Sequence, residues 1–324
     1  MITTSQLAVL QSPKEDQLRN LFSLFLAGKS PGTLKAYSRD INSFSEYIGA
    51  KSPQEGVSSF LSQAPGDAML MVLTYQAHLN ESGLATSTIN RSIAALRSLV
   101  KLARAVGLVN WTLEVKGLPN VPYRDTRGPG IDAVRRMFNH LSKSEKPINI
   151  RNVAIIRLLF DLGLRRGEVV SLDIEHLDIN ALRLSVLGKG RREREYLSIP
   201  EPTALALTNW LTFRGDEPGP LFLNFDRAGK GQRLTGTSIF RIVRKVGKEI
   251  GVKLRPHSLR HTSITEACKI AQSNGMTLEE VMDFSRHKDI RTLMIYRDRI
   301  KNVQGYLASR LVTTSMEDNT TNTI

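Results

Sequence analysis

The chain has 324 residues, enough for two domains of about 150 residues that each bury a core of their own. Hydrophobic residues make up 41% of it and the formal net charge is +14, which indicates a globular protein with a polyanionic partner, nucleic acid before an anionic membrane surface. Apolar runs such as AMLMVL at 68–73 are too short to cross a membrane, and the single cysteine, Cys268, excludes an internal disulfide and a cysteine-rich zinc site. The beginning of the chain lacks the basic stretch of a signal peptide, so we expect a protein of the reducing cytoplasm.

The first 120 residues are expected to form a helical domain. In SPGTLKAYSRDINSFSEYI the apolar residues recur at helical spacing, and Ser30 with Pro31 marks the start of the helix. TSTINRSIAALRSLVKLARAVGLV shows the same pattern and opens on Thr86 or Ser87. Basic side chains lie mostly off the apolar faces, and each is either a solvated surface charge or a contact to the anionic partner. The candidates for such contacts are Lys35, Arg39, Arg91 and Arg97.

A linker follows at about 114–130, because EVKGLPNVPYRDTRGPG has three prolines, three glycines and no periodicity. We place the boundary near 120–127, with a second domain over 127–312 and a polar tail, 313–324, that is expected to be disordered. Residues 1–120 carry a net charge of +3 and the remainder carries +11, so the second domain is the expected place of the anion chemistry.

The second domain mixes helix and strand. RNVAIIRLLFDLG predicts a helix that ends at Gly163, and the segments 182–187 and 195–199 predict two strands of a hairpin. The residues between them place a basic tip on the hairpin, formed by Lys189, Arg191, Arg192 and Arg194. The expected fold class is therefore α+β, mainly helical with a small antiparallel sheet.

Three helices are expected near the end of the chain. A helix begins at Pro256 and ends at Asn274-Gly275. Thr277 with Glu280 forms a capping box for a second helix, and Asp289 can cap a third over IRTLMIYRDRI.

The stretch RPHSLRHTSIT at 255–265 gathers two arginines and two histidines without a carboxylate. His257, Arg260 and His261 share one face near a helix N-terminus, where free N–H groups and the helix dipole favour an anion. A zinc site is the first alternative, but Ser258 stands where the zincin pattern has its glutamate, and Arg260 would repel a cation. A structural helix start is the second alternative, and for His261 we favour that structural interpretation.

From Arg165 onward the sequence resembles the tyrosine recombinases, also called the phage integrase family. The resemblance rests on RNVAIIRLLFDLGLRRGEVVSLDIEHLD, VLGKGRREREYLSIP, RPHSLRHTS and FSRHKDIRTLMIY, and the helical first domain resembles the core-binding domain of the family. It covers roughly residues 15–310. A His-x-x-Arg-His segment combined with a tyrosine nine residues after a further histidine is highly specific, whereas no single piece is.

The resemblance implies a catalytic domain of the tyrosine recombinase type and a role for each matching residue. The implied catalytic residues are Arg165, Lys189, His257, Arg260, His287 and the nucleophile Tyr296. Glu168 and His261 would hold these catalytic residues in position without touching the substrate themselves. The family usually has Leu-Gly before the third-box histidine, and Ser285-Arg286 stands there instead. Arg286 therefore adds a positive charge beside the pocket, and we count it among the candidate DNA contacts.

The implied chemistry follows from the residue types. A phenol with a pKa of about 10 is a poor nucleophile at neutral pH, so Tyr296 needs a positive pocket or a base, for which His257 is the candidate. Arg165 and Arg260 can hold the non-bridging phosphate oxygens as negative charge develops, and Lys189 can protonate the departing 5′-oxygen. These cations would act where other nucleases use metal ions, and we expect neither metal, ATP nor another cofactor.

The resemblance thus implies a site-specific recombinase or integrase that acts on double-stranded DNA through a 3′-phosphotyrosyl intermediate and a Holliday junction. Four protomers would assemble on two DNA sites, joined through a C-terminal helix around 298–311; the alternative is that this helix folds back on its own domain. A type IB topoisomerase-like enzyme and a non-catalytic DNA-binding protein are the alternative functions. The early start of the helical region indicates a compact form without an arm-binding domain, located with DNA in the cytoplasm. The target sequence and the mobile element or chromosome involved stay open.

Overall fold

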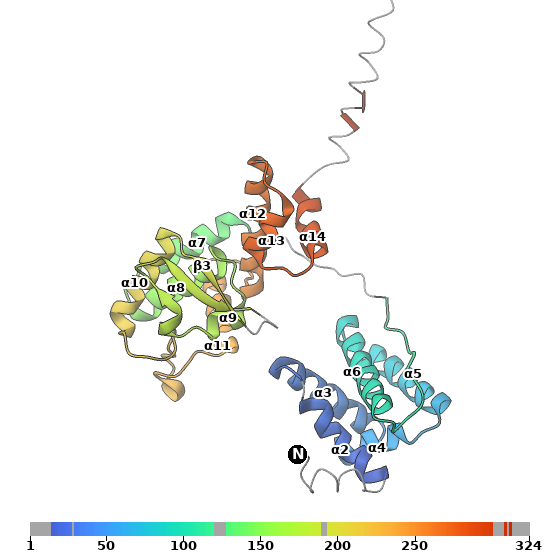
Figure 1. Cartoon of the computed structure of the whole chain (residues 1–324). Helices are drawn as coiled ribbons and strands as arrows, with labels where there is room; N and C mark the ends of the chain where they lie inside the picture. Colours follow the sequence, from blue (N-terminus) through green and yellow to red (C-terminus); the bar gives the residue numbers. More distant parts are fainter. Residues whose placement is uncertain are drawn as a thin grey trace, which may run out of the picture. The chain divides into compact units, whose positions relative to one another are not determined.

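The computed structural model describes residues 14–27, 29–119, 128–188, 193–300, 308–309 and 311–312. The chain divides into two compact units, Met1–Tyr123 and Arg124–Ile324. Figure 1 shows the first unit in blue to cyan and the second in green to red. Within the described ranges, no helix combines the length and the hydrophobicity needed to cross a membrane.

The described part of the first unit is helical. Its core is aromatic at the centre: the ring of Phe44 lies 5.1 Å from the rings of both Phe60 and Tyr75, in edge-to-face geometry. Ser30 caps the second helix by accepting a hydrogen bond from the N–H of Thr33, as the sequence predicts. The helices are α2 (Lys14–Ala27), α3 (Pro31–Tyr47), α4 (Pro53–Leu61), α5 (Pro65–Glu81) and α6 (Thr86–Ala105).

One predicted DNA contact in this unit also has a structural partner. The guanidinium of Arg91 on α6 donates two hydrogen bonds of 2.8 Å to the buried carboxylate of Asp40 on α3. This bidentate pair ties the two helices together. Lys35, Arg39 and Arg97 are exposed, on the same two helices.

The second unit surrounds a small antiparallel sheet with helices. Its sheet has the order β1-β2-β3, and Ser185 on β2 stands opposite Tyr196 on β3. The elements before and within the sheet are α7 (Ile131–Leu141), α8 (Pro147–Phe160), α9 (Arg166–Val170), η1 (Ile174–His176), β1 (Leu177–Asp178), β2 (Arg183–Leu187) and β3 (Arg194–Ser198). The elements after it are α10 (Glu201–Arg214), η2 (Arg227–Gly229), α11 (Gly236–Glu249), α12 (Pro256–Ser273), α13 (Leu278–Ser285) and α14 (Ile290–Ile300).

The expected class, mainly helical with a small antiparallel sheet, is confirmed. The hairpin is present, and Leu184 and Val186 point into the core as expected. Leu182 does not belong to the strand: its φ is 50° and it is 42% exposed, so it lies in the turn before β2. The two-residue strand β1, which extends the hairpin to three strands, was not predicted.

The helix starts near the end of the chain follow their predicted caps. Thr277 and Glu280 cap α13 reciprocally, with N–H to side-chain oxygen distances of 2.6 and 3.3 Å. Asp289 accepts a hydrogen bond of 3.0 Å from the N–H of Arg291 at the start of α14. Most of the predicted helix 298–311, the tail 313–324 and residues 120–127 of the linker lie outside the described residues.

Candidate active site

Arg165 is held at the turn between α8 and α9. Gly163 makes this turn with a φ of 54°, and a side chain there would meet Ser263 and Arg260. Glu168, which is 4% exposed, accepts one hydrogen bond of 2.8 Å from the N–H of Arg165 and another of 2.8 Å from its Nη1. The Arg165 side chain keeps 29% of its surface exposed. One edge of the guanidinium is therefore fixed, and the rest of it can receive an anion from solvent.

Arg260 lies deepest in the site. It is 1% exposed and points from α12 to the carbonyl oxygens of Gly163 and Ser285, to which it donates hydrogen bonds. Burial, together with the nearby charges of Arg165 and Arg286, lowers the pKa of Arg260 to about 9. The guanidinium still carries its charge at neutral pH. Because both carbonyls come from other elements, Arg260 fastens α12 to the turn before α9 and to the end of α13.

Two histidines lie near the arginines, and both rings are uncharged at neutral pH. His257 lies on the exposed face of the first turn of α12, and the surrounding protein, then Arg260 and Arg165, lower its pKa. Burial lowers the pKa of His287 to about 4, and the positive charges of Arg260 and Arg165 act in the same direction. The Nδ1 atom of His287 is 2.9 Å from the hydroxyl of Ser285. Both imidazoles are thus uncharged at neutral pH, able to donate or accept one proton each.

Tyr296 approaches these groups from α14. It is 4% exposed, and its hydroxyl is hydrogen bonded to Nδ1 of His261 on α12. The His261 ring lies 4.1 Å from the ring of His257, and the His287 ring lies 6.4 Å from the ring of Tyr296, both between centroids. The Tyr296 hydroxyl acts on Arg260 electrostatically and raises its pKa, against the larger lowering by burial. The fold therefore gathers residues from α9, α12, the end of α13 and α14 around one phenol.

The structure brings together five of the six implied catalytic residues: Arg165, His257, Arg260, His287 and Tyr296. Lys189, Arg191 and Arg192 lie outside the described residues. Arg194 is exposed at the start of β3 and donates to the carbonyl of Ser185 at 3.1 Å.

Two side chains make contacts that the sequence analysis did not specify. His261, for which we favoured a structural role, contacts the hydroxyl of Tyr296. Its spacing of four residues from His257 was the available signal, because that spacing puts both rings on one helix face. Arg286 is turned inward and is 6% exposed.

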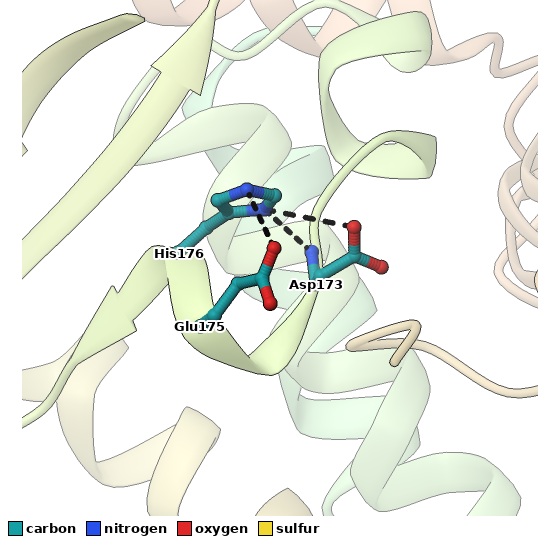
Figure 2. A group of neighbouring side chains, drawn as sticks. All are labelled: Asp173, Glu175 and His176. Atoms are coloured by element: carbon teal, nitrogen blue, oxygen red, sulfur yellow. Dashed lines mark hydrogen bonds and ion pairs between the residues drawn. The ribbon is translucent and has the colours of Figure 1, made fainter. Parts of the chain in front are cut away.

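Asp173, Glu175 and His176 form a separate group in which one possible metal-ligand atom of each side chain lies within 4.8 Å of the others (Figure 2). Nδ1 of His176 accepts a hydrogen bond of 2.9 Å from the N–H of Asp173, so in the neutral ring the proton is on Nε2. A metal at Nε2 would displace that proton to Nδ1, against the donating N–H. The carboxylate of Asp173 is paired with Arg233. We assign this group to the capping of η1 and the anchoring of Arg233.

A helical unit followed by a unit in which arginines and histidines lie around a buried tyrosine is the arrangement that the resemblance to the tyrosine recombinases led us to expect. Residues 131–302 match the phage integrase family, and residues 21–107 match the N-terminal SAM-like domain of phage integrases. The chain belongs to this family: it is a tyrosine recombinase, a DNA strand-exchange enzyme of site-specific recombination.

The similarity extends over nearly the whole chain. A tyrosine recombinase of Synechocystis sp. is 36% identical over 289 residues, which cover 87% of this chain and 91% of the relative. A tyrosine recombinase of Synechococcus elongatus is 34% identical over 290 residues, covering 87% of this chain and 89% of the relative. Among solved structures, the integrase of the transposon Tn1549 in complex with transposon right end DNA has a TM-score of 0.65 at 14% identity, covering 91% of this chain and 99% of the other. This last likeness is one of fold.

Proposed function

We propose that Tyr296 attacks a DNA phosphodiester and forms a 3′-phosphotyrosyl link, which a 5′-hydroxyl of another strand later reverses. The observation that carries this proposal is the position of the Tyr296 hydroxyl, hydrogen bonded to His261 and within electrostatic reach of the buried Arg260. In the attack the phenolic oxygen bonds to phosphorus and the bond to the 5′-oxygen breaks. The number of phosphoester bonds stays the same, so no external energy source is needed.

The proton of the phenol passes to an imidazole. His261 already contacts the hydroxyl, and the adjacent ring of His257 reaches the exposed face of α12. Because burial, and then the charges of Arg260 and Arg165, lower the pKa of His257, that ring is neutral and can accept a proton at neutral pH. The departing 5′-oxygen takes its proton from Lys189, the residue that the family pattern places at the hairpin tip.

The charge that develops on the phosphate is stabilised by fixed cations. Arg165 has its guanidinium anchored on one edge by Glu168 and partly exposed on the other. Arg260 has five N–H donors, of which the carbonyls of Gly163 and Ser285 accept two. His287, neutral because its pKa is lowered to about 4, adds a further hydrogen-bond donor. Groups that are already oriented before DNA binds need little reorganisation in the transition state.

We further propose that four protomers act on two double-stranded sites and exchange strands in pairs through a Holliday junction. The assembly would use the helix predicted around 298–311, and the enzyme would work with DNA in the cytoplasm. The net charge of +14 supports strong contact with the phosphate backbone, which should weaken steeply with salt.

The test is a nicked duplex that traps the covalent adduct, because the short strand released beyond the nick diffuses away. Wild-type protein should form an adduct that resists denaturation, and Tyr296→Phe should form none. An adduct that persists in the Tyr296→Phe variant contradicts the assignment of the nucleophile. Exchange products between two sites then distinguish recombination from the resealing of a single strand.

A further inference from the structure

Arg286 occupies a backbone position that disfavours side chains. It ends α13 in the left-handed region, with φ 54° and ψ 38°, and its N–H donates a hydrogen bond of 2.7 Å to the carbonyl of Met282. Glycine is the usual residue at such a helix end, and the family pattern has glycine here. An arginine at this position must therefore contribute through its side chain.

The guanidinium of Arg286 lies among two carboxylates and a carbonyl. Its Nη2 is 2.9 Å from Oε2 of Glu168 and 3.3 Å from the carbonyl oxygen of Gly163. Its Nε is 3.6 Å from Oε1 of Glu195 on β3. Glu168 is the same carboxylate that anchors Arg165, so the two arginines share one buried acid.

A second link joins the two arginines through the backbone. Nη2 of Arg165 donates a hydrogen bond of 3.2 Å to the carbonyl oxygen of Arg286. That carbonyl belongs to the peptide bond that leads into His287. The Arg286 side chain therefore fixes Glu168, Glu168 fixes Arg165, and Arg165 fixes the backbone next to His287, in a closed ring of contacts.

We propose that Arg286 is a positioning residue of the strand-cleavage reaction. Through Glu168, it fixes the position of the Arg165 guanidinium relative to the turn before His287. This inference rests on the function proposed above. The contact between Arg286 and Glu195 also ties the end of α13 to β3, a strand of the hairpin on which the family pattern places the catalytic lysine. Arg165 and the turn before His287 then share one buried point of attachment.

The competing role for Arg286 is direct contact with DNA. Its side chain is 3% exposed, and to reach a phosphate it would have to leave both carboxylates. Separating a buried ion pair is unfavourable because the abandoned charges stay desolvated. The two roles differ in what they affect: a phosphate contact sets affinity, whereas a positioning residue sets the rate of the bound complex.

The experiment compares three substitutions at this one position in the full chain. Arg286→Gly suits the left-handed backbone, so it should fold. Arg286→Met and Arg286→Lys keep a β-carbon, as the wild type does, so they meet the same backbone strain, and they differ from each other in charge. Lys269→Met is the control, since Lys269 pairs with Glu266 on the exposed side of α12 and its loss changes the net charge equally.

The substrate is obtained by covalent capture on sheared genomic DNA, followed by synthesis of the captured site as a nicked duplex. Adduct formation is measured in single turnover at saturating protein, and affinity for the intact duplex is measured by fluorescence anisotropy over a series of salt concentrations. We expect Arg286→Gly and Arg286→Met to form adduct about 10- to 100-fold more slowly than wild type, as misaligned catalytic groups do. Their Kd values should stay within about twofold of wild type. Arg286→Lys should lie between Arg286→Met and wild type, because an ammonium can pair with Glu168.

Three results would overturn the proposal. The first is an Arg286→Gly variant that cleaves as fast as wild type when saturated with DNA. The second is a loss confined to Kd, with a shallower salt dependence, which identifies Arg286 as a phosphate contact. The third is an Arg286→Lys variant no faster than Arg286→Met. Failure of the proposed function looks different, because then wild-type protein itself captures no DNA or Tyr296→Phe captures as much as wild type.

Discussion

Replacing Glu168 with glutamine should destabilise the second unit, because this carboxylate lies between two guanidiniums. It accepts hydrogen bonds of 2.8 Å from Nη1 and from the N–H of Arg165, and one of 2.9 Å from Nη2 of Arg286. A glutamine has nearly the same shape, but it has no charge and turns an NH₂ group toward donors. Leaving a buried ion pair without one partner costs about 3–5 kcal/mol.

The expected loss is smaller than this range, because the Arg165 side chain is 29% exposed and water can solvate part of its charge. We expect the free energy of unfolding to fall by about 2–3 kcal/mol on these grounds. For a unit of 150–250 residues, each kcal/mol shifts Tm by about 2–4 °C, so the transition should move down by about 4–12 °C.

Differential scanning calorimetry of the full chain measures this shift. Glu266→Gln is the matched control: it neutralises a carboxylate 2.8 Å from Lys269, whose side chain is 52% exposed. Such a surface pair contributes about 0–1 kcal/mol, so the control should stay close to wild type. If Glu168→Gln melts with the control, the buried carboxylate does not hold the site together and the reasoning fails.

Three further predictions follow from burial. The pKa of His287 is about 4 in the folded state and about 6.5 in the unfolded chain, so between these pH values only the unfolded chain binds a proton at this imidazole. The free energy of unfolding should therefore fall by up to about 3 kcal/mol as the pH drops from about 6.5 to 4. Urea unfolding at both ends of this range should show a smaller loss in His287→Asn, and an equal loss would contradict the assignment. Arg260→Lys should slow adduct formation about 100- to 1,000-fold, since one ammonium cannot serve both carbonyls and a phosphate; a rate near that of wild type in single turnover would argue against a phosphate contact. Burial raises the pKa of Cys268 to about 11, so iodoacetamide at pH 8 should modify the thiol only as urea unfolds α12, and rapid labelling of native protein, seen by mass spectrometry, would refute this.

The parts of the site that local rules govern could be predicted from the sequence. Pro256 sets the start of α12, and the spacing of His257, Arg260 and His261 then places all three on one face. The Thr277 cap of α13 was equally visible, because a capping box involves only neighbouring residues.

The parts that depend on packing between distant segments could not be predicted. The contact between His261 and Tyr296 joins residues 35 apart and exists because α14 packs against α12. Arg286 was visible as a departure from the family pattern, but the partner of its side chain is Glu168, 118 residues earlier in the chain. Strand β1 has two residues, too few for an alternation of polar and apolar side chains to be recognised.

The tyrosine and the arginines rest on two different apolar clusters. Leu164, Val169 and Leu259 belong to the large cluster beneath Arg165 and Arg260, whereas Tyr296 packs with Ile264, Cys268 and Leu293 in a small one. Helix α12 contributes to both. Hydrogen bonds such as the one between His261 and Tyr296 connect the groups carried by the two clusters. Hydrogen bonds weaken over tenths of an ångström, whereas apolar contacts tolerate small displacements. The position of the Tyr296 hydroxyl relative to the arginines is therefore set where the two clusters meet, on α12.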